Sequence, residues 1–443
     1  MEILITAAQF ILALSILITL HEFGHYWAAR AFGIRIEKFI LFFDAWNFKL
    51  FSFKRGDTEY GMGWLPLGGY VKIAGMIDES MDKEQMSKPK ESWEFRSKKV
   101  WQRLIIMIGG VTVNLFLGFF IYGAIFWYWG GADLNPKKLS QGMAIHPYLA
   151  KYDLHSGDII TKVDGNEVHS FEDINKGVLL RNKTNLTIVR QGKELTRTLP
   201  EAIDQELFQN GAMGVANFRV IAQSVEEVVQ SGNGERAGLK AKDRILSIDK
   251  TPTQYFDEIQ KALYKKRGNK ATLSVLRGKD TLSLITEVTM EGTIGFAGKN
   301  VGTSDTLALA PVSYDVGQSI AKGFLGGGQL LKDYVAQFKF VFTKKGASSV
   351  GGFARIGDMF AGFWDWKIFW LNTAFLSIAL AFMNILPIPA LDGGHVVFLM
   401  YEGITGKEAP QKILEYAQYI GIFLLLGLMI YANGNDLIQM VFK

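Results

Sequence analysis

The sequence predicts a polytopic α-helical membrane protein with about four transmembrane helices and two tandem α+β domains between the second and third of them. Two observations lead to this fold class. Four apolar segments approach the ~20 residues that a membrane span needs, and the region 145–300 is polar and repeats itself. Hydrophobic residues make up 49% and charged residues 21% of the 443 residues, which fits a few spans joined to a polar part.

The composition excludes several classes of function. The net charge is only +5 and the chain has no long basic run with interleaved aromatic residues, so no nucleic acid is expected as a partner. The chain contains no cysteine, which excludes disulfides, thiol nucleophiles and thiolate metal sites. A metal ion would therefore have to be bound by histidines and carboxylates.

Four spans are predicted from the apolar segments. The first lies within 1–33, because Ile3 to Leu20 carry no charge. A cleaved signal peptide is the alternative, but it would need a basic n-region, and the N-terminal tail offers only Glu2. The other three spans are expected at 104–130, 366–400 and 411–433.

The distribution of Lys and Arg predicts the orientation, because cytoplasmic loops carry an excess of both residues. The segment 34–103 is rich in them, whereas the N-terminal tail has none. We therefore expect residues 35–100 on the cytoplasmic side. Both termini and the 130–360 region are then expected outside, which in a Gram-negative bacterium is the periplasm.

The polar region contains two copies of one unit. Residues 154–174 align with residues 239–259 at an offset of 85, and each copy runs into a strand–turn–strand signal with Gly-Lys at its turn. Two modules are predicted, at 131–215 and 216–303. They resemble PDZ domains, which bind extended peptides by adding a strand to a sheet edge. The alternative is that they are rigid spacers that exclude bulky molecules, and both interpretations stay open.

The residues 304–365 are predicted to form a linker with an amphipathic helix on the membrane surface. Apolar spacing begins at Val316 and is interrupted by scattered lysines. The run Gly326 to Gly328 argues against one continuous helix, because glycine weakens helices.

The segment His21-Glu22-Phe23-Gly24-His25 predicts a metal site. Positions i and i+4 share one face of a helix, so both imidazoles can reach one zinc ion, and the intervening Glu22 can reach a zinc-bound water. Zinc lowers the pKa of that water toward ~7, and Glu22 can then act as a general base. Alternatively, His21 only marks a helix end at the membrane interface, but ionisable residues in a membrane are usually functional.

A third ligand is expected from the end of the third span. A catalytic zinc usually has three protein ligands and one open position. Asp392 follows a Pro- and Gly-rich stretch, and such broken backbone occurs at membrane depth only where it is buried in protein or lines a cavity. Asp392 is therefore the predicted third ligand, with His395 as the alternative.

These motifs resemble those of the site-2 protease family, and of its regulator-of-sigma-E type in particular. The resemblance rests on HExxH in the first span and on the sequence NxxPxPxLDG from Asn384 to Gly393, and it covers essentially the whole chain. It implies that His21, His25 and Asp392 bind Zn²⁺ and that Glu22 is catalytic. It also implies a membrane-associated β-hairpin at 61–72. The substrate-binding residues that it implies are Asn384, Pro387, Pro389, Gly68, Gly69 and Tyr70.

The resemblance further implies the activity and its setting. Proteases of this type cut single-span membrane proteins in the bilayer, namely anti-sigma factors already trimmed outside and remnant signal peptides. It places the chain, expected as a monomer, in the bacterial inner membrane, with the PDZ-like pair in the periplasm as a gate and the active site near the cytoplasmic side. A transporter or metal channel is an alternative, because intramembrane His, Glu and Asp also mark ion pathways. An inactive membrane scaffold that presents the modules is a further alternative, but the intact HExxH and the distant Asp392 argue against it.

Overall fold

The computed structural model describes residues 1–66, 68–76, 89–212, 214–222, 224–298, 308–341, 343, 346 and 351–442. The chain divides into two compact units. The first comprises Met1–Trp129, Ser313–Val335 and Gly346–Ile438, and the second comprises Gly130–Val312, Ala336–Lys345 and Gln439–Lys443.

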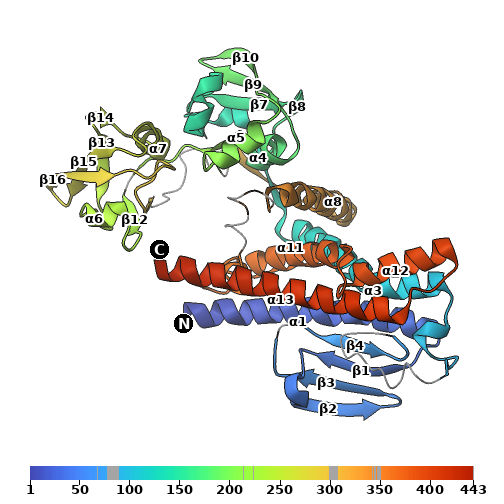
Figure 1. The fold of residues 1–443 in the computed structure, drawn as a ribbon. Coiled ribbons are helices and arrows are strands. Elements are labelled where there is room, and N and C mark those ends of the chain that lie inside the picture. Colours follow the sequence, from blue (N-terminus) through green and yellow to red (C-terminus); the bar gives the residue numbers. More distant parts are fainter. Residues whose placement is uncertain are drawn as a thin grey trace. The chain divides into compact units, whose positions relative to one another are not determined.

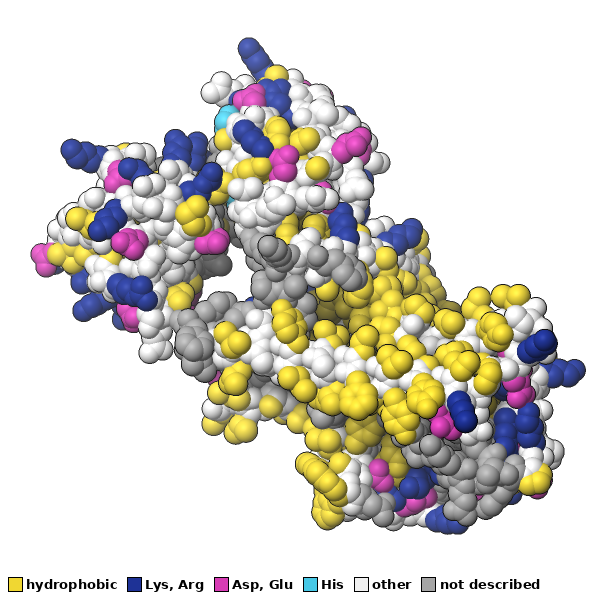
Figure 2. All heavy atoms as spheres, viewed as in Figure 1, with side chains coloured by type: hydrophobic (Ala, Val, Ile, Leu, Met, Phe, Trp, Pro, Cys, Tyr) yellow, Lys and Arg dark blue, Asp and Glu magenta, His cyan; other side chains and the backbone are white. Residues whose placement is uncertain are grey.

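The first unit is built on long helices that lie side by side (Figure 1). Four helices of the described chain are long and apolar enough to cross a membrane, which confirms the predicted helical membrane protein: α1 (Glu2–Ala31), α3 (Val100–Trp129), α11 (Trp366–Ile385) and α13 (Gln411–Phe442). Figure 2 shows hydrophobic side chains spread along the visible face of these helices, with charged side chains gathered at one end. Such a broad apolar surface is typical of contact with lipid.

A short non-helical segment, residues 386–391, separates α11 from the next helix, α12 (Asp392–Thr405). Asp365 caps the start of α11 by accepting a hydrogen bond from the N–H of Ile368 (2.9 Å). Leu386, which precedes Pro387, is extended and ends the helix, because a residue before proline avoids the helical conformation. Asp392 is thereby the first residue of α12.

A four-stranded sheet follows α1 and lies along its C-terminal half (Figure 1). Its strand order is β2-β3-β1-β4, and a short helix α10 (Phe353–Gly357) completes the first unit. The strands are β1 (Ile36–Leu41), β2 (Lys49–Arg55), β3 (Thr58–Gly63) and β4 (Tyr70–Ile73).

The prediction that residues 61–72 form a hairpin is wrong, because the two strands at its ends do not pair with each other. β1 lies between β3 and β4, parallel to β3 and antiparallel to β4. The hairpin in this sheet is instead formed by β2 and β3, with Gly56 at positive φ in its turn. The sequence pattern showed the strands, but pairing with a strand more than 20 residues away leaves no local signal.

The second unit contains two α+β modules of the same construction. The first module has the sheet β10-β9-β7-β8, and the second has β14-β13-β15-β16. The repeat extends to details: a register shift lies between Ile160 and Lys162 in β7 and between Ile245 and Ser247 in β13, 85 residues on. The helices are α4 (Phe171–Leu180) and α5 (Ile203–Gln209) in the first module, and α6 (Asn233–Arg236) and α7 (Phe256–Lys265) in the second.

The remaining strands of this unit complete the modules and join their ends. β11 pairs with β6, β17 pairs with β12, and β18 pairs with β5, which brings the entry and exit of the unit together. The strand bounds are β5 (Gly131–Leu134), β6 (Met143–Ile145), β7 (Ile159–Val163), β8 (Asn166–Glu167), β9 (Asn185–Arg190), β10 (Lys193–Thr198), β11 (Ala216–Phe218), β12 (Val225–Val228), β13 (Arg244–Ile248), β14 (Thr251–Pro252), β15 (Lys270–Arg277), β16 (Asp280–Glu287), β17 (Phe296–Gly298) and β18 (Leu309–Val312).

The glycine run at 326–328 does not interrupt the linker helix, contrary to the prediction. The helix α8 runs unbroken over Val316–Val341. A Cβ on Gly327 would overlap the Phe119 ring, and one on Gly323 would overlap the backbone of α3. Small residues four apart allow two helices to approach closely, so this packing compensates for the low helix propensity of glycine.

Candidate metal centre

Two histidines of α1 and the first residue of α12 meet in the interior of the first unit. His21 and His25 are buried, and their Nε2 atoms lie 3.2 Å apart. Asp392 lies 3.2 Å from His21 Nε2 through Oδ2 and 3.4 Å from His25 Nε2 through Oδ1. One ligand atom from each of the three residues falls within 4.8 Å of the other two. Two features create this arrangement. His21 and His25 are one turn apart on α1, and the non-helical segment before Asp392 places this residue at the start of α12.

These distances are compatible with one metal ion shared by the three residues. Ligand atoms ~2.0–2.2 Å from a tetrahedral zinc lie ~3.3–3.6 Å from one another. The two Nε2 atoms are 3.2 Å apart, and each lies 3.2 or 3.4 Å from a different oxygen of Asp392. Asp392 Oδ2 is buried and, apart from its contact with His21 Nε2, has no hydrogen-bond partner among the described residues. A buried carboxylate oxygen in that state is expected to face a cation.

Both imidazoles are oriented through their other ring nitrogen. His25 Nδ1 lies 2.8 Å from the carbonyl oxygen of Ile106, which fixes Nδ1 as the protonated nitrogen and leaves Nε2 free as a ligand. Asn114 Nδ2 lies 3.3 Å from His21 Nδ1. The carbonyl oxygen of Asn114 in turn accepts a hydrogen bond from Ser377 Oγ (2.6 Å), which ties α3 to α11 at the site.

A glycine of α3 leaves room for the two imidazoles. A Cβ on Gly110 would overlap His25 Nε2 and the His21 ring. Any larger residue at position 110 would therefore occupy the space in which the two Nε2 atoms meet.

Glu22 lies between the metal cluster and the edge of the sheet. Its carboxylate lies near the backbone of Val71 in β4. Glu22 lines a cavity of about 390 Å³ together with Gly69, Tyr70 and Val71. An acidic side chain therefore faces both the metal cluster beside it on α1 and a space next to an edge strand.

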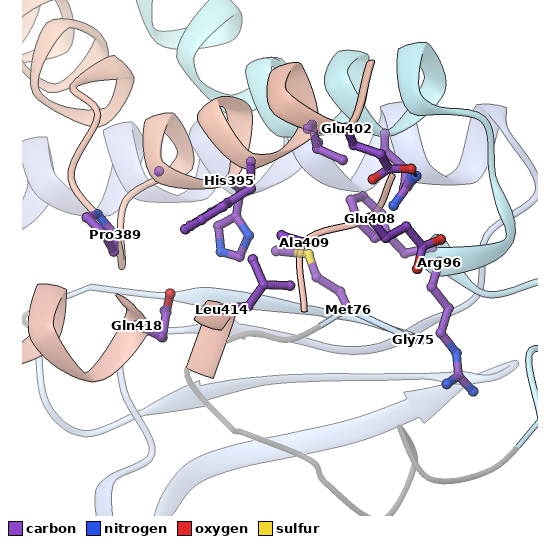
Figure 3. A pocket seen from close by; sticks show the side chains of 15 residues that line it. Gly75, Met76, Arg96, Pro389, His395, Glu402, Glu408, Ala409, Leu414 and Gln418 are labelled. Carbon is purple, nitrogen blue, oxygen red and sulfur yellow. Dashed lines mark hydrogen bonds and ion pairs between the residues drawn. The ribbon is translucent and has the colours of Figure 1, made fainter. Parts of the chain in front are cut away.

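A second cavity of about 120 Å³ adjoins the first and shares His395, Gln418 and Met76 with it. Figure 3 shows His395 of α12 directed into the space between the helices and the sheet, with Gln418 of α13 on the opposite side. His395, the alternative third ligand, is not part of the metal cluster. Because the two cavities share three residues, they lie next to each other.

The predicted substrate-binding residues fall into three groups. Asn384 reaches the metal cluster, with Nδ2 3.3 Å from His21 Nε2. Pro389 lines the smaller cavity, and Gly69 and Tyr70 line the larger cavity beside Glu22. Pro387 is exposed, and Gly68 packs closely against the Phe43 ring; neither lines these two cavities.

Three contacts at the site were not predicted. Asn114 is buried within α3. A polar asparagine in the middle of an apolar span could have indicated a residue of the site. Gln418 accepts a hydrogen bond from the N–H of Ala390 through Oε1 (3.2 Å) and so holds the broken segment before Asp392. The proximity of Val71 to Glu22 had no signal in the sequence, because it depends on strand position and not on residue type.

Comparison with known proteins identifies the family. A family model described as peptidase family M50 matches residues 9–428. The chain belongs to peptidase family M50. It is 29% identical to the regulator of sigma E protease of Haemophilus influenzae, over 99% of this chain and all of that protein. It is also 28% identical to the regulator of sigma-E protease RseP of Escherichia coli, over 97% of each chain.

The M50 assignment confirms the predicted enzyme class. Relatives from Vibrio cholerae and Xylella fastidiosa, 27% and 28% identical over 98% and 97% of this chain, bear names that describe zinc metalloproteases. The protein is therefore a metalloprotease with zinc as its cofactor, in a chain with four helices suited to a membrane. The resemblance seen in the sequence is thereby confirmed.

Proposed function

We propose that this M50 peptidase cuts single-span membrane proteins within the bilayer, with His21, His25 and Asp392 as zinc ligands and Glu22 as the general base. One observation carries the proposal. Two imidazoles of a membrane-type helix and a carboxylate of a broken one converge within 4.8 Å, beside a second carboxylate that faces a cavity. Burying these four ionisable side chains in an apolar helical unit costs free energy, and residues of this kind in membrane segments are usually functional.

Each residue of the centre has a task in peptide hydrolysis. Zinc at this site supplies a Lewis acid and a water molecule of lowered pKa. Glu22 accepts the proton of the attacking water and later donates it to the leaving amine. The amide of Asn384, next to His21, is positioned to donate a hydrogen bond to the oxygen of the scissile carbonyl group, where negative charge develops.

The edge of β4 is the proposed place of substrate capture. A membrane-spanning helix must unwind before its peptide bonds are accessible, because its amides are paired within the helix. β4 is an outer strand of its sheet, and its residue Val71 lies near Glu22. An unwound substrate segment can pair with this edge and pass Glu22 in an extended conformation. Gly69 and Tyr70 then contact the substrate.

The sheet itself is proposed to enter the membrane. On β2 and the turn before it, large apolar side chains are exposed: Trp46, Phe48, Leu50, Phe51 and Phe53. Trp46 and Trp64 stack with 5.7 Å between ring centroids. Exposed aromatic and aliphatic side chains on a strand edge favour insertion into the interfacial region of the bilayer.

The relatives' names support a place in envelope stress signalling. Two of them bear the name regulator of sigma-E protease. We infer that the substrates of this chain are single-span anti-sigma factors that have been trimmed outside, together with remnant signal peptides. The setting is the bacterial inner membrane, with residues 35–100 in the cytoplasm and the two modules, as PDZ-like domains, in the periplasm. The modules would reject substrates whose external domains are intact.

The first test is cleavage in detergent of a single-span substrate with a short external tail, with wild type beside Glu22→Gln. The substitution removes the general base but keeps side-chain size, so zinc content and unfolding temperature should match wild type while turnover falls by about 10²–10⁴-fold. Equal cleavage by both proteins would reject the role of Glu22.

A further inference from the structure

The first module contains an internal contact in the place where an extended peptide would add to its sheet. Asn175 of α4 reaches across to β11. Its Oδ1 accepts hydrogen bonds from the N–H groups of Val215 (2.7 Å) and Ala216 (3.0 Å), and its Nδ2 donates to the carbonyl oxygen of Ala216 (3.0 Å). One carboxamide thus pairs with three backbone groups at the start of one strand.

These three bonds are the ones that the last residue of an added strand would make. Adjacent N–H groups after a glycine turn form a concave anion site that captures a C-terminal carboxylate, and the next carbonyl group accepts an N–H of the same peptide. Asn175 Oδ1 stands in for a carboxylate oxygen, and Asn175 Nδ2 stands in for the peptide N–H. The loop that precedes β11 contains Gly211 and Gly214, and Gly214 lies beside the Asn175 amide.

The second module lacks this contact. At the 85-residue offset Gln260 replaces Asn175, and β17 replaces β11 as the strand after the glycine loop. Among the described residues no side chain is hydrogen-bonded to the backbone of Phe296–Gly298. A cavity of about 250 Å³, lined by Phe256 and Ile259 of α7 and by β17, lies there instead. The contact between the Asn175 side chain and β11 is therefore specific to the first module and is not required by the fold that the two modules share.

Space for a ligand exists in front of Asn175. The amide lines a cavity of about 470 Å³ within the second unit, together with His146, Ala216, Gln260 and Tyr264. His146 is half-buried there, its burial lowers its pKa to about 4, and Tyr264 packs edge-on against its ring. His146 therefore adds no positive charge to this wall, and Glu291 also lines the cavity. The N–H groups of Val215 and Ala216 remain as the anion-binding element.

We propose that the first module holds a latent binding site for an extended peptide with a free C-terminal carboxylate, and that the Asn175 side chain occupies this site until it swings away. The ligand pairs with β11 as an added strand. Its carboxylate takes the N–H groups of Val215 and Ala216. Binding and closure by Asn175 exclude each other, because both use the same three backbone groups.

The test uses the full chain in detergent with Glu22→Gln, so that binding is read without cleavage and independently of the proposed protease mechanism. The probe is a fluorescent ten-residue peptide that ends in Ala-Val, either with a free carboxylate or as the C-terminal amide. Asn175→Ala should bind the carboxylate form at least tenfold more tightly than the parent, with new amide protection from hydrogen exchange in the segment 211–218. The amide form should show no gain. Gln260→Ala, the matched change in the second module, should behave as the parent does.

Two further variants keep the test decisive if the alanine substitution weakens the fold. Asn175→Asp still accepts from both N–H groups and repels a carboxylate, so it should stay closed. Asn175→Ser cannot reach β11, and its lowered unfolding temperature should be restored by the carboxylate peptide and not by the amide. The proposal is overturned if Asn175→Ala and Asn175→Ser gain no binding, if both peptide forms bind equally, or if both variants lose the module fold and the peptide does not restore it.

Discussion

Asn114 Nδ2 of α3 lies 3.3 Å from His21 Nδ1 of α1, inside the helical unit and next to the metal cluster. When His21 Nε2 binds a metal ion, Nδ1 carries the ring proton, so the amide oxygen of Asn114 must turn toward it to accept this proton. That oxygen is buried without a partner among the described residues. Metal binding and the orientation of Asn114 are therefore coupled.

Replacing Asn114 should weaken zinc binding without abolishing it. In Asn114→Leu the proton on His21 Nδ1 has no acceptor, and loss of such a partner typically lowers metal affinity by ~10–100-fold. Zinc retained after dialysis against a graded chelator series measures the effect. Thr112→Val is the matched control, because Thr112 Oγ1 bonds only within its own helix, to the carbonyl oxygen of Ile108. Equal zinc retention in Asn114→Leu and wild type would show that Asn114 does not support the site.

Asp392 and His395 should differ sharply as zinc ligands. Asp392→Ala removes one of three ligand groups and should lower zinc affinity by more than the ~10–100-fold typical of a supporting residue. His395→Ala should keep zinc, since His395 lies outside the metal cluster and lines the cavities. Metal content by mass spectrometry of the purified proteins decides between them. If His395→Ala loses zinc and Asp392→Ala keeps it, the ligand assignment is wrong.

The first module should lose stability in mild acid through His146. Burial lowers the pKa of His146 to about 4, below the ~6.5 of an unfolded histidine. The unfolded chain therefore binds more protons between pH 6.5 and 4, so this stability contribution is complete above pH 6.5 and falls as the pH drops toward 4. At ~1.4 kcal/mol per pKa unit, the loss is on the order of 3 kcal/mol.

The control for this pH effect keeps the local hydrogen bond. His146 Nδ1 accepts a hydrogen bond from the N–H of Tyr148 (3.3 Å), and an asparagine can accept the same bond without titrating. His146→Asn should therefore flatten the decline of unfolding temperature between pH 6.5 and 4. An identical decline in both proteins would assign the acid sensitivity to other groups.

Removal of the modules should widen the range of substrates. β5 pairs with β18, so residues 135–308 can be replaced by a short Gly-Ser linker between neighbouring strands. We expect the shortened protease to cut single-span proteins whose external domains are intact, and the full chain to cut only trimmed ones. The same deletion with Glu22→Gln controls for contaminating proteases. If the shortened enzyme is active on trimmed substrates and still rejects intact ones, the modules do not form the gate.

The grouping of His21, His25 and Asp392 could be predicted because each residue stands in a local sequence pattern. His21 and His25 are one helical turn apart, and Pro387 with Gly393 and Gly394 marks the broken helix that presents Asp392. The structure brings these distant segments together as the motifs required. The repeat at an offset of 85 residues likewise predicted two small α+β modules, and the structure shows that their four-stranded sheets have matching strand orders.

Contacts between distant segments were the part that the sequence could not show. β1 inserts between β3 and β4, and nothing local in residues 61–72 reveals a strand that pairs with both. The run Gly326 to Gly328 was expected to break α8, but packing of this helix against Phe119 of α3 overrides the low propensity of glycine. Asn114 was missed because its role depends on which helix faces it.

The most direct test of the account is to locate the bond that is cut. The enzyme and a single-span substrate with a short external tail are reconstituted in liposomes, and mass spectrometry identifies the product ends, with Glu22→Gln in parallel. The account predicts that wild type alone cuts a bond inside the membrane-spanning segment. A cut confined to the external tail, or the same products from Glu22→Gln, would contradict it.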